Sequence, residues 1–148
     1  MLQKIIHTDQ SVSTIFVRLL VGTVFLSEGI QKFMFPEILG AGRFVEIGIP
    51  FPEFMALFVG FFEILCGTMV TIGLVTRLAN IPLFIIILTA ILTTKVGLLS
   101  SQGFWKMLHE TRTDWSMLLG SLFLIIEGGG KWSFDNWLSK MRLKRRRK

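Results

Sequence analysis

Four apolar stretches, separated by polar turns, divide the chain. They occupy about residues 13–33, 54–75, 78–99 and 114–129, and a helix needs about 20 mostly apolar residues to cross a bilayer. The fourth stretch, of roughly 16 residues, would cross only where the bilayer thins or a neighbouring helix tilts. The third contains I-P-L-F-I-I-I-L and lacks the polar stripe of a helix in a soluble bundle. The pattern predicts an all-α fold: an integral membrane four-helix bundle in one domain, residues 1–148.

The segment between the first two stretches predicts a further short helix. It reads F-P-E-I-L-G-A-G-R-F-V-E-I-G-I-P-F-P-E-F, residues 35–54. Pro36 suits a first helical turn, whereas Gly48, Pro50 and Pro52 impose an extended turn before the second stretch. We expect a short amphipathic helix that lies along the membrane interface. Farther on, Ser133 is expected to cap a last helix, with Trp132 and Trp137 at interface height.

Composition and charge support a multi-pass membrane protein. Hydrophobic residues make up 51% of the chain and charged residues only 18%, whereas about a quarter of a soluble domain is charged. The start M-L-Q-K would suit a cleaved signal peptide, but the apolar core is long and no A-x-A-like site follows. Lys and Arg concentrate at one set of segment ends, which predicts cytoplasmic N- and C-termini in the inner membrane.

The chain ends in a basic tail, residues 140–148, that reads K-M-R-L-K-R-R-R-K. Such tails can bind nucleic acid. Beside several membrane spans, attraction to anionic lipid head groups is the commoner role, so lipid rather than nucleic acid is the expected partner. The residues expected to contact head groups are Lys144, Arg145, Arg146, Arg147 and Lys148.

Ionisable residues interrupt the apolar stretches, where they are costly and usually face a bundle interior or a cavity. A rise of about 1.5 Å per residue arranges them in two layers. The outer layer, which with Arg18 supplies the candidate site, contains Glu28, Lys32, Glu63 and Lys95. The inner layer contains Arg18 with a predicted ion network of Arg77 and Glu127.

The outer layer is the strongest functional candidate. Glu28 and Lys32 are four residues apart on one helix face. Lys32 is near enough to the interface to extend its ammonium outward, so we expect Glu28 to turn inward, towards Lys95 or Glu63. The functional interpretation is a polar site for a proton-coupled step, a solute or a quinone head group. The alternative is an ion network that only fixes helix register.

Other cofactor chemistry finds little support in the sequence. The single cysteine, Cys66, cannot form a dithiol and lies on the helix face of Glu63, where packing is its default role. His7 and His109 lie outside the apolar stretches, so haem bound within the bilayer is not expected. No metal-ligand spacing such as H-x-x-H or C-x-x-C occurs, so no metal is expected either.

Several motifs together resemble the DoxX family of small four-span membrane proteins. They are R-L-L-V-G-T-V-F-L-S-E-G-I-Q-K-F at residues 18–33, G-I-P-F-P-E-F at 48–54, E-I-L-C-G at 63–67 and G-L-V-T-R-L-A at 73–79, followed by D-W at 114–115 and G-G-G-K-W-S-F-D at 128–135. The resemblance covers nearly the whole chain. It implies a four-helix membrane bundle with both ends inside. The positions it marks are Arg18, Glu28, Lys32, Glu63, Arg77 and Asp135.

The function implied by this resemblance is a membrane subunit of a redox system concerned with thiols, sulfur or oxidative stress. The subunit would hold quinone or dock a soluble redox or sulfur-handling protein, and the residues identify no catalytic group of its own. Two other functions stay open on the residues alone. One is a small solute or ion carrier that uses the buried carboxylates, and the other is a non-catalytic assembly factor. A site at a homodimer interface also stays open.

Overall fold

The described part of the chain, residues 11–146 with side chains to residue 141, folds entirely into helices and turns in this computed structural model. The helices are α2 Thr14–Met34, α3 Ala41–Glu46, α4 Pro52–Ile72, α5 Thr76–Ala90, a π-helical turn Ile91–Lys95, α6 Val96–Gln102, α7 Phe104–Glu110, α8 Arg112–Glu127 and α9 Phe134–Arg146. The all-α membrane bundle predicted from the sequence is confirmed.

Each predicted apolar stretch coincides with a helix. Within residues 11–146, three helices are long and apolar enough to cross a membrane: α2, α4 and the continuous helix Thr76–Gln102 that joins α5 to α6. The fourth, α8, has 16 residues. The short helix α3 forms within the predicted segment, between α2 and α4. That α8 crosses the bilayer and that α3 lies along its surface stay predictions.

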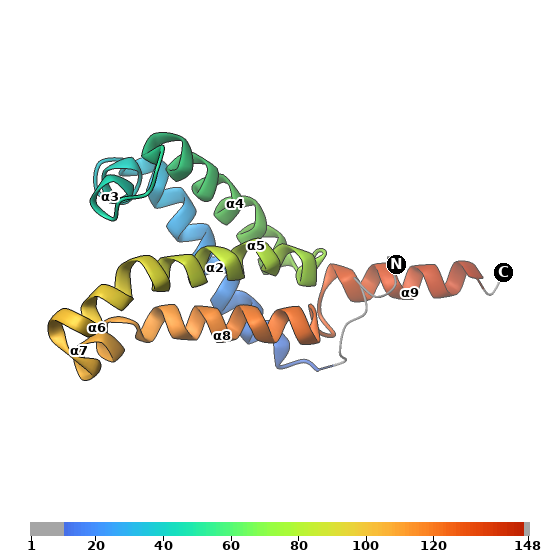
Figure 1. The fold of residues 1–148 in the computed structure, drawn as a ribbon. Coiled ribbons are helices and arrows are strands. Elements are labelled where there is room, and N and C mark those ends of the chain that lie inside the picture. The colour runs from blue at the N-terminus through green and yellow to red at the C-terminus, as the bar shows by residue number, and fades with distance from the viewer. Residues whose placement is uncertain (1–10, 147–148) are drawn as a thin grey trace.

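The long helices associate as two antiparallel pairs. α2 packs mainly against α4, and α5 packs mainly against α8. The pairs meet near the α4–α5 turn and the α8–α9 loop, and they diverge towards α3 and α7, so that the ribbon has the shape of a V (Figure 1). The buried apolar core includes Val21, Val70, Leu83 and Leu124, each fully or almost fully buried. Residues from all four helices therefore hold the joined end of the V together.

Glycines bring α2 and α4 into backbone contact. A Cβ atom added at Gly67 would lie 2.8 Å from the backbone N of Leu26 and 2.9 Å from the backbone O of Gly22. A Cβ atom at Gly29 would lie 2.8 Å from the backbone O of Gly60. Small residues commonly permit such close approach between membrane helices. We call this contact line the glycine seam.

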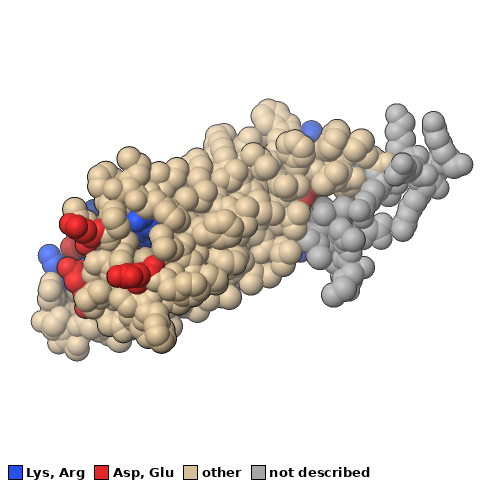
Figure 2. All heavy atoms as spheres, turned by 90° about the horizontal axis from the view of Figure 1, so that it is seen from above, with Lys and Arg blue, Asp and Glu red and all other residues tan. Residues whose placement is uncertain are grey.

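The outer surface of the helices is apolar along most of its length. Large exposed side chains such as Phe16, Phe61, Ile85 and Leu119 occur on each long helix. Figure 2 shows charged side chains gathered at the end of the molecule that carries α3 and α7, with few in the long middle section. This distribution fits helices whose sides contact lipid and whose ends reach water.

Candidate functional site

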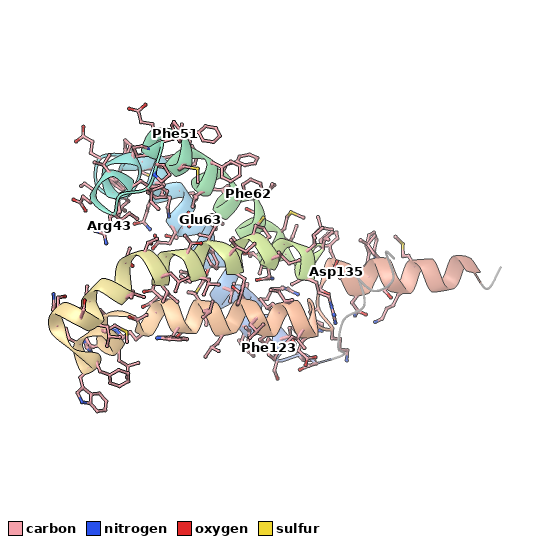
Figure 3. The ribbon with its side chains drawn as sticks, viewed as in Figure 1. Arg43, Phe51, Phe62, Glu63, Phe123 and Asp135 are labelled. Carbon is pink, nitrogen blue, oxygen red and sulfur yellow. The ribbon has the colours of Figure 1, made fainter. Side chains whose placement is uncertain are left out.

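A buried ion pair joins α2 to α4. Nζ of Lys32 lies 2.7 Å from Oε2 of Glu63, and the two side chains are 12% and 4% exposed. Figure 3 shows Glu63 on the side of the α2–α4 pair that faces α5. At this distance the ammonium of Lys32 and the carboxylate of Glu63 form a direct, charge-assisted contact that is almost completely shielded from solvent. We call this contact the Lys32–Glu63 pair.

Glu28 does not turn inward as expected from the sequence. Its side chain is 52% exposed, and its Oε2 lies 3.9 Å from Nζ of Lys32. The prediction that Lys32 extends outward and that Glu28 pairs with Glu63 or Lys95 was therefore wrong. The positions of Gly29 and Gly60 explain why Lys32, and not Glu28, points inward. The glycine seam brings α2 so close to α4 that Lys32 reaches Glu63 directly. An exposed carboxylate, an ammonium and a buried carboxylate now follow one another inward.

Lys95 belongs to a second, separate ion pair. Its Nζ lies 3.4 Å from Oδ2 of Asp114 and donates a hydrogen bond of 3.2 Å to the backbone O of Glu110. Lys95 ends the π-helical turn Ile91–Lys95, where the added residue changes the direction of the following side chains. The predicted outer layer is thus divided, with Lys32 and Glu63 on one arm of the V and Lys95 on the other (Figure 1).

Arg18 occupies the joined end of the bundle. It is 4% exposed. Its Nε donates to the backbone O of Thr71 at 3.2 Å, and its Nη1 donates to the backbone O of Gly129 at 2.7 Å. Arg18 therefore connects α2 to the end of α4 and to the α8–α9 loop, and its contacts identify a structural role.

Asp135 supplies the second half of this connection. Its two carboxylate oxygens accept hydrogen bonds from the backbone N–H groups of Val75, at 2.7 Å, and Thr76, at 2.9 Å. Its own backbone N–H donates to the backbone O of Gly73 at 3.0 Å. Val75 has a φ of 49°, a conformation that is rare for a β-branched residue, and it lacks a side-chain cap of its own. Asp135 thus caps α5 from 60 residues away.

The predicted inner network of Arg77 and Glu127 does not form. Both side chains are half-buried, and among the described residues no ion pair joins them. Hydrogen bonds donated by Arg18 and accepted by Asp135 stabilise the joined end of the bundle instead. The tight α4–α5 turn leaves backbone C=O and N–H groups without helical partners, and these two charged side chains bind them.

Two other predictions concern the C-terminal segment. Ser133 caps α9 as expected, because its Oγ accepts a hydrogen bond from the backbone N–H of Asn136. The predicted head-group contacts fall on Lys144 to Lys148, whose side chains lie outside the described residues.

Cys66 is buried between the helices, as expected of a packing residue.

Replacing Asp135 with Asn is expected to weaken the α4–α5 turn. Asn has one neutral acceptor oxygen, so one of the backbone N–H groups of Val75 and Thr76 keeps only a neutral acceptor and the other loses its acceptor. The expected cost is about 1.5–3 kcal/mol in the free energy of unfolding. Hydrogen exchange at residues 73–76 and detergent unfolding would measure the effect. The matched variant Glu37→Gln, at an exposed loop position, should change stability by no more than about 0.5 kcal/mol. Equal effects of the two variants would contradict the capping role.

Comparison with known proteins is consistent with this architecture. The sequence profile of the DoxX family matches residues 13–96, more than half of the chain. The chain belongs to the DoxX family. Residues 13–96 include α2, α4 and α5 with the π-helical turn, and therefore both members of the Lys32–Glu63 pair.

Two relatives match along most of their length. An uncharacterized membrane protein of Mycobacterium tuberculosis is 52% identical over 143 residues, which cover 93% of this chain and 88% of the relative. The "Putative oxidoreductase CatD" of Bacillus subtilis is 27% identical over 130 residues, which cover 87% of this chain and 89% of the relative. No solved structure gives a significant match. The chain is therefore an integral membrane protein of the DoxX family, and the more distant of these two relatives is named for redox chemistry.

Proposed function

We propose that this DoxX-family chain is a membrane subunit of a redox system, of the kind that handles thiols, sulfur or oxidative stress, and that the Lys32–Glu63 pair is its binding site. The observation that carries the proposal is the burial of this pair in two helices fit to cross a membrane. Ionisable residues at such positions mark functional sites by default, because burying them is costly. The name of the CatD relative adds support for redox chemistry.

The chemistry of the pair fits a quinone head group. The ammonium of Lys32 can donate a hydrogen bond to a carbonyl oxygen, and the carboxylate of Glu63 can accept one from a hydroxyl. The glycine seam closes the space between α2 and α4, so the head group would approach from the side that faces α5. A bound quinone would supply reversible exchange of two electrons and two protons, while Lys32 and Glu63 would orient it and hold a proton.

The electrons would come from another protein. The chain has one cysteine, Cys66, and a dithiol–disulfide exchange requires two. A soluble thiol or sulfur-handling oxidoreductase, docked on the membrane surface, would meet that need. We therefore propose an accessory, quinone-linked subunit that is not an enzyme by itself.

Purification from the native membrane in mild detergent tests this function. We expect a quinone, identified by mass spectrometry of the extracted lipids, at near-stoichiometric amount with the native chain. Glu63→Gln should lower that amount at least tenfold, because the charged acceptor is lost. The control Glu53→Gln, at an exposed position in the first turn of the same helix, should keep it. Quinone absent from the native chain, or retained equally by both variants, would reject the proposed site.

A carrier of protons or small cations is the second candidate function. It is favoured by the spatial order of three charged groups. The exposed Glu28, the ammonium of Lys32 and the buried Glu63 follow one another from water towards the bundle interior. In vesicles that contain the purified chain, this function requires a flux that Glu28→Gln reduces. Vesicles without flux across a panel of ions and solutes would remove it.

We also propose an inner-membrane location with both termini in the cytoplasm, from the distribution of Lys and Arg. In Figure 1 the first turn of α2 and the first turn of α9 both lie at the joined end of the V, which is consistent with an even number of crossings between them.

A further inference from the structure

A groove lies where the C-terminal end of α4 meets the α8–α9 loop and the first turns of α9. Its volume is about 630 Å³, and its lining includes Ile72, Lys131, Trp132, Trp137 and Lys140. We call it the tryptophan groove. It is at the opposite end of α4 from α3, far along the bundle from the Lys32–Glu63 pair (Figure 1). It has no part in the function proposed above.

Two lysines give the groove positive charge. The side chains of Lys131 and Lys140 are both exposed. Within the part of the chain that the structure describes, no carboxylate forms an ion pair with either of them. The nearby carboxylate of Asp135 is buried and occupied by backbone N–H groups. Two exposed ammonium groups without an ion-pair partner among the described residues favour an anionic occupant of the groove.

Exposed aromatic rings surround these charges. Trp132 is 63% exposed, Phe134 51% and Trp137 54%, and the rings of Phe134 and Trp137 meet edge to face at 5.8 Å. Tryptophan rings concentrate at the level of lipid head groups, where one side is apolar and the other is wet. Lysine with tryptophan at a helix end is therefore the combination expected at a membrane interface.

An apolar track leads from the groove along α4. Ile72, Leu65 and Phe61 are 42%, 44% and 55% exposed. Their spacings of seven and four residues place them on one face of the helix. A molecule whose anionic part lies in the groove can therefore lay a hydrocarbon chain along the same helix.

We propose that the tryptophan groove binds one anionic phospholipid, with its phosphate between Lys131 and Lys140 and an acyl chain along the α4 track. Charge complementarity selects the anionic head group, and the apolar track selects a lipid over a soluble phosphate. The groove includes Lys140, the first residue of the basic tail, but none of the head-group contacts predicted at Lys144–Lys148. Two lysines near an anionic head group give an expected preference over a neutral lipid of about thirtyfold.

Fluorescence quenching by brominated lipids tests the site. The full chain, with Trp105→Phe and Trp115→Phe, would be reconstituted in vesicles of phosphatidylcholine and phosphatidylglycerol in which only one lipid carries brominated acyl chains. We expect brominated phosphatidylglycerol to quench Trp132 and Trp137 far more strongly than brominated phosphatidylcholine at equal mole fraction. The double change Lys131→Gln and Lys140→Gln should abolish that preference.

Two controls separate this groove from other causes. Lys106→Gln, an exposed change on α7, and removal of residues 144–148 should each leave the preference in place. Equal quenching by the two lipids in the unmodified groove would overturn the proposal and favour an acidic protein as the occupant. Loss of the preference on removing residues 144–148 alone would also overturn it, as would abolition of the preference by millimolar inorganic phosphate.

Discussion

Replacing Lys32 with Met is expected to destabilise the bundle by about 3–5 kcal/mol, because a buried charge that loses its ion-pair partner is not compensated by solvent. Glu63 is 3% exposed, and its carboxylate would remain in the interior of the α2–α4 pair with no cation near it. Unfolding in mixed micelles of mild detergent and sodium dodecyl sulfate, followed by circular dichroism, would measure the loss.

The double variant Lys32→Met with Glu63→Leu distinguishes a buried pair from a simple packing effect. Removing both charges together should recover most of the lost stability, since apolar replacements of buried ion pairs are often neutral or stabilising. The exposed pair of Arg43 and Glu46 on α3 provides the control. Arg43→Met should change the free energy of unfolding by no more than about 1 kcal/mol. A double variant as unstable as Lys32→Met would contradict the electrostatic account.

The same double variant also bears on function. If the Lys32–Glu63 pair served stability alone, apolar replacement would retain both fold and activity. A double variant that folds stably but no longer binds quinone, or no longer supports flux in vesicles, would instead show that the two charges serve function and do not stabilise the fold. Stability and function therefore have to be measured on one set of variants.

The helices could be predicted from the sequence because a bilayer imposes long apolar runs with few alternatives. Each predicted stretch agrees with an observed helix to within a few residues, and the helix at Ala41–Glu46 also lies in the predicted segment. The fourth stretch shows the limit of this reasoning, since α8 has only 16 residues and its length alone does not require a crossing.

The partners of the buried charges were harder to predict. Counting residues along a helix gives the depth of a side chain in the membrane, but it does not show which neighbouring helix that side chain faces. Glu28 and Lys32 lie on similar faces, and only the contact of Gly29 with Gly60 determines which of them meets Glu63. Asp114 was missed as the partner of Lys95 because it stands at the edge of its stretch. Lys95 and Asp114 lie at similar distances from the predicted outer ends of their apolar stretches, and this similarity could have indicated the pair.

The role of Asp135 could not be predicted from any local pattern. Helix α5 begins after Val75, which has no capping side chain, and the cap comes from the start of α9. The glycines of G-G-G before it permit the loop that carries Asp135 back to the turn, and Gly128 ends α8 at a φ of 83°. Contacts across 60 residues depend on the complete fold, which a search for local caps does not consider.

The glycine seam gives the second large expected effect. Gly67→Val should destabilise the chain by more than about 3 kcal/mol, or prevent folding, because the new side chain would meet backbone atoms that cannot rotate away. Its Cβ alone would lie 2.8 Å from the backbone N of Leu26 and 2.9 Å from the backbone O of Gly22. The helices would have to separate, and their separation would also draw Lys32 away from Glu63.

Gly97→Val is the matched control, because a Cβ atom added at Gly97 on α6 meets no atom within 4 Å. There the substitution should be neutral or slightly stabilising, since glycine is a weaker helix former than valine by a few tenths of a kcal/mol. Expression, monodispersity in detergent and unfolding midpoints of the two variants would be compared. Similar behaviour of both variants would show that α2 and α4 are not in backbone contact, and would remove the geometric reason for the Lys32–Glu63 pair.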